Sequence, residues 1–193
     1  MKKSTIITLA AVAALAFWLI GAYNSMVTAE EGVQSAWSQV ENVYQRRADL
    51  ISNLVSTVKG YAAHESETLE SVVSARAKAT QVTVDPSDLT PEALARFNTA
   101  QGELSSALGR LLLIQENYPE LKANQNFLEL QAQLEGTENR IATERMKFNE
   151  AAQAFNTGIR RFPDNIIASM FGFEKKAYFE AQAGAETAPK VEF

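Results

Sequence analysis

The sequence predicts an all-α protein, in which an N-terminal transmembrane helix continues into an antiparallel bundle of three long helices and a short fourth helix. Three observations support this fold class. An apolar run opens the chain, apolar residues then recur every three or four positions over long stretches, and no useful length alternates with the period of two typical of strands. Short polar breaks between such stretches indicate antiparallel neighbouring helices.

The 193-residue chain is long enough for one domain together with an anchor. We expect an anchor over residues 1–25, a bundle over 26–180 and a flexible tail over 181–193. The net charge of −5 disfavours binding to nucleic acid, because contact with phosphates requires a basic surface. The sequence has no cysteine, which excludes disulfides, thiolate catalysis and cysteine metal sites.

The apolar run from Ile6 to Tyr23 predicts a helix that crosses the lipid bilayer. A helix of this length would span roughly 27 Å, close to the thickness of the hydrocarbon layer. Leu15 lies near the middle of the run. Trp18 and Tyr23 lie toward its outer end, where aromatic residues are common at the membrane–water interface.

The residues that flank this run predict its orientation. Lys2 and Lys3 precede it and no basic residue follows until Arg46, so the positive-inside rule places the N-terminus in the cytoplasm and the bundle outside. Residues 14–16 resemble a cleavage site, but apolar residues 17–20 continue beyond them, which favours an uncleaved anchor over a cleaved signal peptide. Because the remaining chain is acidic, we expect the anchor, rather than a basic patch, to hold the protein on the bilayer.

Residues 24–81 are predicted to form one helix that leaves the membrane, with Gly32 and Gly60 as weak points. Its apolar stripe keeps helical spacing over almost the whole length. The stripe consists of Trp37, Val40, Tyr44, Ile51, Leu54, Val58, Tyr61, Leu69 and Val72.

Local signals predict where the other helices begin and end. Thr90 can cap, and Pro91 can open, a second helix that runs to about Asn117. A third helix is predicted over 124–161, because its apolar stripe continues to a proline-containing break. A short fourth helix follows, and Gly172 is expected to end it.

The third predicted helix carries an apolar stripe whose second half is missing. Positions seven apart are Phe127, Leu134, Ile141, Phe148, Phe155 and Phe162, whereas the companion positions include Thr137, Glu144 and Gly158. Arg47 and Glu65 likewise interrupt the stripe of the first helix. We interpret the residues around these interruptions as a polar layer that consists of Arg47, Glu65, Glu138, Asn139, Glu144 and Arg145.

Such a layer sets helix register or forms an interface, because an unpaired charge is costly inside an apolar core. Its carboxylates leave two alternatives open: a site for an ion or small ligand, and acid–base catalysis. The pairs Phe148-Asn149 and Phe155-Asn156 also recur seven residues apart. We interpret both asparagines as the rim of the core, where an amide can bond across helices or to a partner.

No sequence pattern for catalysis, a metal or a cofactor is recognisable. The sole histidine, His64, would need a second histidine four residues later to form a zinc-protease motif, and that residue is Thr68. One histidine and no cysteine leave no recognisable pair of nucleophile and base. We therefore predict no catalytic residue, no metal site and no cofactor.

Several blocks of the sequence resemble the LemA family of bacterial membrane proteins. They are Tyr23-Asn24, RRADLISNLVSTVKGYAAHE over 46–65, the block from ENYPELK to IRRFP over 116–163, DNIIASMFGFE and AYFEA. The resemblance covers nearly the whole chain and is weakest over about 79–100, and Phe148 stands where the family usually has tyrosine. It implies a single-pass protein of the inner (cell) membrane, with an extracytoplasmic, periplasmic bundle and no established enzymatic activity.

The resemblance also implies partners in the cell envelope. Genes of the family commonly lie near that of a membrane metalloprotease, and one relative takes part in forming magnetosome membranes. We therefore expect a non-enzymatic scaffold or adaptor that contacts the lipid bilayer and forms a homo-oligomer or binds a membrane protease or another envelope protein. The alternative is a binding module for an ion, peptide or small ligand at the polar layer.

Overall fold

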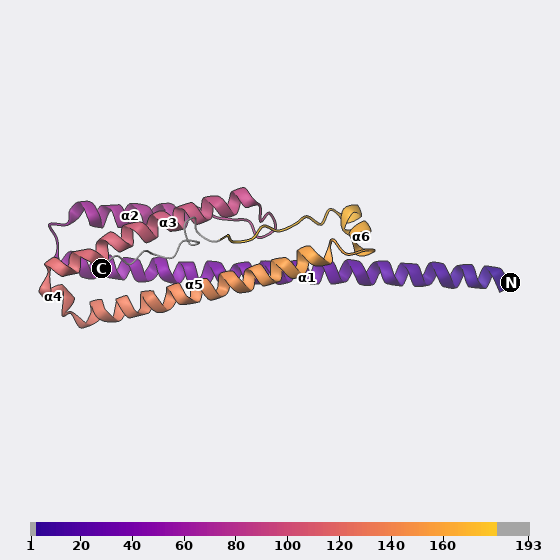
Figure 1. Cartoon of the computed structure of the whole chain (residues 1–193), viewed down its shortest axis with the longest axis horizontal. Coiled ribbons are helices and arrows are strands. Elements are labelled where there is room, and N and C mark those ends of the chain that lie inside the picture. The colour runs from indigo at the N-terminus through magenta and orange to yellow at the C-terminus, as the bar shows by residue number, and fades with distance from the viewer. Residues whose placement is uncertain (1–2, 181–193) are drawn as a thin grey trace, which may run out of the picture.

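The computed structural model describes residues 3–180, and this part of the chain is helical and contains no strand. The helices are α1 (Lys3–Tyr61), α2 (Ser66–Gln81), α3 (Pro91–Leu113), the 3₁₀ helix η1 (Ile114–Asn117), α4 (Pro119–Lys122), α5 (Gln125–Gly158) and α6 (Asp164–Phe171). The all-α fold class is confirmed. After α6, residues 173–180 form a non-helical return segment along the bundle (Figure 1). The predicted tail over 181–193 lies outside the described residues.

α1 is the axis of the molecule. Its N-terminal part projects beyond the other elements, while α5 runs antiparallel along the remainder and the α2–α3 hairpin covers another side (Figure 1). The projecting part includes the most apolar window of the helix, which has a mean hydropathy of 2.2 and no buried residue. Among the described residues, α1 is the one helix long and apolar enough to cross a membrane. Ile6, Leu15, Trp18 and Tyr23 are all exposed.

The single helix predicted over 24–81 is two helices. α1 ends at Tyr61, and a turn over 62–65 reverses the chain into α2. Gly60 lies beside this end, where its low helix propensity weakens the last turn. The apolar stripe did not reveal the break because Leu69 and Val72 in α2 are buried in the same core as Leu54.

Capping groups mark three other helix ends, and the predictions made for Thr90, Pro91 and Gly172 are confirmed. The Thr90 hydroxyl accepts a hydrogen bond from the backbone N–H of Ala93 at 3.3 Å, with Pro91 as the first helical residue. The Asn124 side chain accepts from the N–H of Phe127 at 2.9 Å. α6 ends at Gly172, whose φ of 75° is a left-handed conformation that glycine adopts without steric cost.

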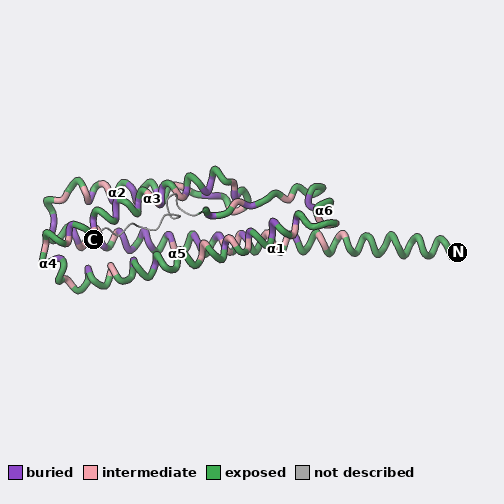
Figure 2. The backbone as a smooth tube through the Cα atoms, viewed as in Figure 1, coloured by how far each residue is buried: buried purple, intermediate pink, exposed green. Residues whose placement is uncertain are grey.

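The buried residues form two clusters along the bundle, and Figure 2 marks which parts of each helix are buried. The proximal core, nearer the projecting part of α1, includes Trp37, Phe97, Phe148, Phe155 and Phe179. The distal core includes Ile51, Leu54, Leu104, Leu111 and Phe127. On α1 the proximal core reaches Tyr44 and the distal core begins at Leu50. The candidate site lies between them.

Candidate functional site

Arg47 lies on α1 between the two cores and is only 2% exposed. Its Nε is 3.0 Å from Oε1 of Glu138 on α5, and its Nη2 donates a hydrogen bond to Oγ of Ser105 on α3. The Nε–H makes no aligned hydrogen bond within the described residues, so the contact with Glu138 is an ion pair without a linear hydrogen bond. Three helices therefore meet at one buried guanidinium.

One of the positions that interrupt the apolar stripe of α5 is Thr137, which directly precedes Glu138. Thr137 is buried, and its hydroxyl donates to the backbone carbonyl of Gln133 at 2.7 Å. Thr137 is thus a small polar residue whose hydroxyl is satisfied inside its own helix. We refer to Arg47, Ser105, Thr137 and Glu138 as the polar boundary.

Arg145 lies two helical turns beyond Glu138 on α5. Its Nη2 donates to the carbonyl oxygen of Glu180 at 3.2 Å, and its guanidinium lies 4.4 Å from the centre of the Phe179 ring, a cation–π contact. Burial raises the pKa of Tyr44 on α1, while the positive charges of Arg145 and Arg47 partly offset this effect. The Tyr44 hydroxyl is therefore protonated at neutral pH and is available as a hydrogen-bond donor.

A pocket of about 310 Å³ is lined by residues of α1, α3 and α5 and by Glu180. α1 contributes Tyr44 and Arg47, and α5 contributes Glu138 and Arg145. α3 contributes Asn98, Gln101 and Ser105, among others. Guanidinium, phenol and amide groups are suited to hydrogen bonding with a small polar ligand, especially one that carries a carboxylate. In the described part of the chain, no cluster of three or more metal-binding side chains occurs.

The structure brings three of the six predicted polar-layer residues to this pocket and separates the other three. Glu65 lies at the turn between α1 and α2, where it accepts a hydrogen bond from the Tyr118 hydroxyl at 3.1 Å. Glu144 forms an ion pair with Lys147 at 2.8 Å. Asn139 has an exposed side chain. The pocket thus contains Arg47, Glu138 and Arg145 but none of these three.

Asn149 and Asn156 hold the return segment against α5, a role that sequence analysis did not identify. Oδ1 of Asn156 accepts from the N–H of Lys176 at 2.9 Å, and Nδ2 donates to the Lys176 carbonyl at 2.8 Å. Asn149 makes the same pair of bonds with Phe179, at 2.8 and 2.9 Å. Seven helical residues and three extended residues both cover about 10 Å, which matches the two spacings. We call this pair the asparagine clamp.

Lys176 fastens the return segment to two further elements. Its side chain is buried, and its Nζ lies 2.7 Å from Oε1 of Glu30 on α1 and donates to the carbonyl of Ser87 at 2.9 Å. The charge is thus paired and hydrogen-bonded, as a buried ammonium requires. The only sequence signal for this arrangement was the Phe-Asn repeat.

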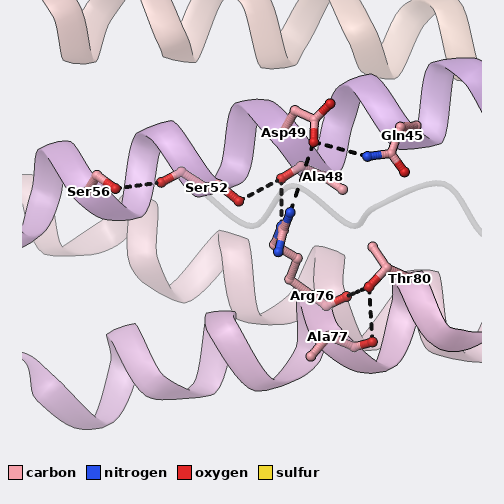
Figure 3. A network of polar contacts seen from close by, with 8 residues as sticks. All are labelled: Gln45, Ala48, Asp49, Ser52, Ser56, Arg76, Ala77 and Thr80. Atoms are coloured by element: carbon pink, nitrogen blue, oxygen red, sulfur yellow. Dashed lines mark hydrogen bonds and ion pairs between the residues drawn. The ribbon is translucent and has the colours of Figure 1, made fainter.

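A separate arginine holds the α2 helix against α1 (Figure 3). Nε of Arg76 donates to the backbone carbonyl of Ala48 at 2.8 Å, and its Nη2 lies 4.0 Å from Asp49. The Ser52 hydroxyl donates to the same carbonyl at 3.2 Å. The network shares no residue with the pocket beside Arg47, although both involve neighbouring turns of α1. It fixes the α2–α3 hairpin to α1.

Comparison with known proteins gives a consistent set of relatives. The sequence pattern described as the LemA family matches residues 36–193. Magnetosome protein MamQ 2 of Paramagnetospirillum magneticum is 28% identical over 94% of this chain and 73% of the relative. Magnetosome protein MamQ of Magnetospirillum gryphiswaldense is 28% identical over 88% and 68%, respectively. Protein LemA of Metamycoplasma hominis is 26% identical over 86% and 72%. Neither LemA nor MamQ is a known enzyme family.

Proposed function

The chain belongs to the LemA family, and from that membership we propose that it is a non-enzymatic, membrane-anchored scaffold or adaptor of the bacterial cell envelope. Its anchor crosses the inner membrane once, with the N-terminus in the cytoplasm and the bundle on the periplasmic side. Two relatives bear the name of magnetosome proteins. Their likeness supports a role in organising an envelope component rather than in a reaction.

The continuity of α1 carries this proposal. The helix is 59 residues long, which corresponds to roughly 88 Å at ~1.5 Å per residue. It joins the exposed apolar run directly to the bundle without a linker. A bundle built on such an anchor projects from the membrane as a stiff rod, which suits lateral assembly or presentation of a distant docking surface.

The mass of the complete chain in detergent tests this role. If the protein is a self-associating scaffold, light scattering with correction for bound detergent is expected to give a multiple of the 21.2 kDa chain mass. If it is an adaptor, chemical crosslinking in envelope membranes is expected to join the chain to a protease or another envelope protein. A strict monomer that forms no crosslink in the envelope would contradict the proposal.

The pocket supports a second candidate function, as a binding module for a small ligand. The supporting observation is the lining of the pocket, which brings two guanidinium groups, those of Arg47 and Arg145, together with the phenol of Tyr44. The buried Nε–H of Arg47 also has no aligned hydrogen-bond acceptor in the described residues. Calorimetry with small dicarboxylates, and separately with Ca²⁺, is the test. Heat with a dicarboxylate that disappears in Arg145→Ala would support the second candidate, and the absence of heat with every ligand would contradict it.

A further inference from the structure

We propose that α6 forms a second membrane contact, lying in the outer lipid–water interface beside the anchor with its exposed apolar side chains in the boundary of the acyl chains. The partner is the lipid bilayer itself. This inference rests on the proposed function in one respect, since it requires the apolar run of α1 to cross the membrane. It adds that the folded bundle, as well as the anchor, touches lipid.

Apolar side chains lie on more than one face of α6. Ile167 and Ala168 are buried toward the proximal core, so one face of the helix is accounted for by packing. Ile166 and Met170 are one turn apart on a different face, and Met170 is 71% exposed. Phe171 is also exposed, and Phe162, just before the helix, is 83% exposed. Such a concentration of large apolar side chains on a small surface is typical of an interaction site.

α6 lies beside the C-terminal end of the apolar run of α1. The ring of Tyr23 lies 4.8 Å from that of Phe171 and 5.7 Å from that of Phe173, measured between ring centres. Leu19 and Ala22 pack against the proximal core, so the folded part of the protein reaches the last turn of the apolar run (Figure 1). α6 therefore lies level with the outer end of the predicted span rather than above it.

This height identifies the occupant of the exposed face. The run that ends at Tyr23 extends for about 27 Å, barely enough for the hydrocarbon layer. If the whole run is used to cross the bilayer, its last turn lies at the outer boundary of the acyl chains, and α6 beside it must lie there too. A short amphipathic helix with aromatic and aliphatic residues on one side is suited to that depth. The contact is thus continuous with the apolar surface of the anchor.

The charges beside α6 fit the same partner. Arg160 and Arg161 are exposed in the turn between α5 and α6, directly before Phe162. Basic side chains at this height can reach the phosphates of anionic lipids, although the chain as a whole has a net charge of −5. The sequence-based expectation that the anchor, rather than a basic patch, holds the protein on the bilayer is thus extended by a second contact at α6. Two contacts at different points would also restrict rotation and tilt of the rod, which a single helix permits.

The test uses the full 193-residue chain in lipid vesicles. Because the sequence contains no cysteine, one introduced cysteine can be labelled with a fluorophore at a single chosen position. Variants Met170→Cys, Leu15→Cys and Leu113→Cys would each carry a polarity-sensitive fluorophore. Leu113 is a matched control, since it is similarly exposed but lies at the end of α3 near the distal end of the bundle. The vesicles would contain phosphatidylcholine and phosphatidylglycerol, with nitroxide quenchers attached either near the headgroup or deep in the acyl chain.

The inference predicts a blue shift and strong quenching of the Met170→Cys probe by the shallow quencher, with little effect on the Leu113→Cys probe. The Leu15→Cys probe reports the anchor and is expected to respond most to the deep quencher. If Leu15→Cys is quenched while Met170→Cys behaves like Leu113→Cys, the α6 contact is wrong and the anchor stands. If neither Leu15→Cys nor Met170→Cys is quenched, the anchor and the α6 contact are both wrong.

A second measurement moves the fluorophore to another position and changes Met170 itself. Met170→Glu places a charge on the exposed face without touching the buried residues of α6. Carrying the probe at Phe162→Cys, this variant is expected to lose most of the shallow quenching in the same vesicles, while its helical circular dichroism stays unchanged. Undiminished quenching in the Met170→Glu background would overturn the inference.

Discussion

The proximal and distal halves of the bundle are closed in different ways. The proximal core is rich in aromatic residues. The ring centres of Phe97, Phe148 and Phe179 lie 5.4, 5.6 and 5.8 Å from that of Trp37. Part of it is sealed by a segment without helical structure, held by the asparagine clamp. The distal core is mostly aliphatic and is sealed by the α2–α3 hairpin. One long helix can thus support two kinds of closure when a polar boundary separates them.

The two halves differ in what determines which segment can close each core. Leucine, valine and alanine in the distal core repeat with the helical period, so any well-packed amphipathic helix can meet them. The proximal core needs particular backbone groups to be paired, because an irregular segment cannot satisfy its own N–H and C=O groups. We therefore expect the proximal half to be more sensitive to single polar substitutions, and the following predictions test that difference.

The largest expected effect is that of Trp37→Ala. Trp37 is fully buried and its ring contacts three phenylalanine rings. Removing a large buried ring should lower the free energy of unfolding by about 3–5 kcal/mol. Urea denaturation followed by circular dichroism measures this change. Leu113→Ala, at an exposed site, is the control and should lie within about 0.5 kcal/mol of the unchanged protein.

Asn156→Ala should cause the second-largest loss in the free energy of unfolding. It removes both hydrogen-bond partners of the buried Lys176 backbone, and two unpaired groups should cost about 2–4 kcal/mol. The loss should be local, so limited trypsin digestion is expected to cut first near Lys175 and Lys176 while the distal half stays protected. Asn149→Ala, at a half-buried position, should show the same pattern more weakly. Digestion that begins in the α2–α3 hairpin would contradict the clamp.

A smaller effect is expected at the polar boundary. Glu138→Ala leaves the Arg47 charge without its carboxylate, but the Glu138 side chain is 47% exposed, so water replaces part of the interaction and the loss should be about 1–2 kcal/mol. In the Arg47→Met background the same substitution should be nearly neutral, because no buried charge remains. Denaturation of the four proteins in this double-mutant cycle measures the coupling. Equal losses in both backgrounds would show that Arg47 and Glu138 do not interact.

The smallest effect concerns alkaline pH. The pKa of Tyr44 is raised in the folded protein by burial, so above a pH of about 10 the unfolded chain loses this proton first. The unfolded state then binds fewer protons than the folded state, and stability falls as pH rises from that point until the folded-state pKa is passed. Tyr44→Phe should show a shallower fall than the unchanged protein over this range. Thermal melting as a function of pH compares them.

The sequence was sufficient for features that depend on local chemistry. Thr90 and Gly172 mark helix ends because a side-chain acceptor or a left-handed backbone is decided by a few neighbouring residues. The turn after Tyr61 was not resolved, because apolar residues on either side keep the same spacing and face the same core. Periodicity alone does not distinguish one long helix from two that meet at a short turn.

The candidate site was predictable only where helical spacing determines it. Arg47 interrupts the apolar stripe of α1, Glu138 follows the interruption at Thr137 on α5, and the antiparallel packing of the two helices brings Arg47 and Glu138 to one level. Glu65 also interrupts a stripe, but the unpredicted turn gives it a different neighbour, Tyr118. The return segment has no periodic pattern, so its contacts with Asn149 and Asn156 could not be assigned to particular partners.

The most direct test of the account is the topology of the complete chain in cells. A single cysteine at Leu113→Cys, in a chain that otherwise has none, can be labelled with a membrane-impermeant maleimide in spheroplasts, and membranes can then be washed with alkaline carbonate. A bundle carried outside the cytoplasm on a membrane-crossing α1 predicts labelling without permeabilisation and retention of the protein in the washed membrane. Labelling only after permeabilisation, or release into the wash, would contradict the anchored rod.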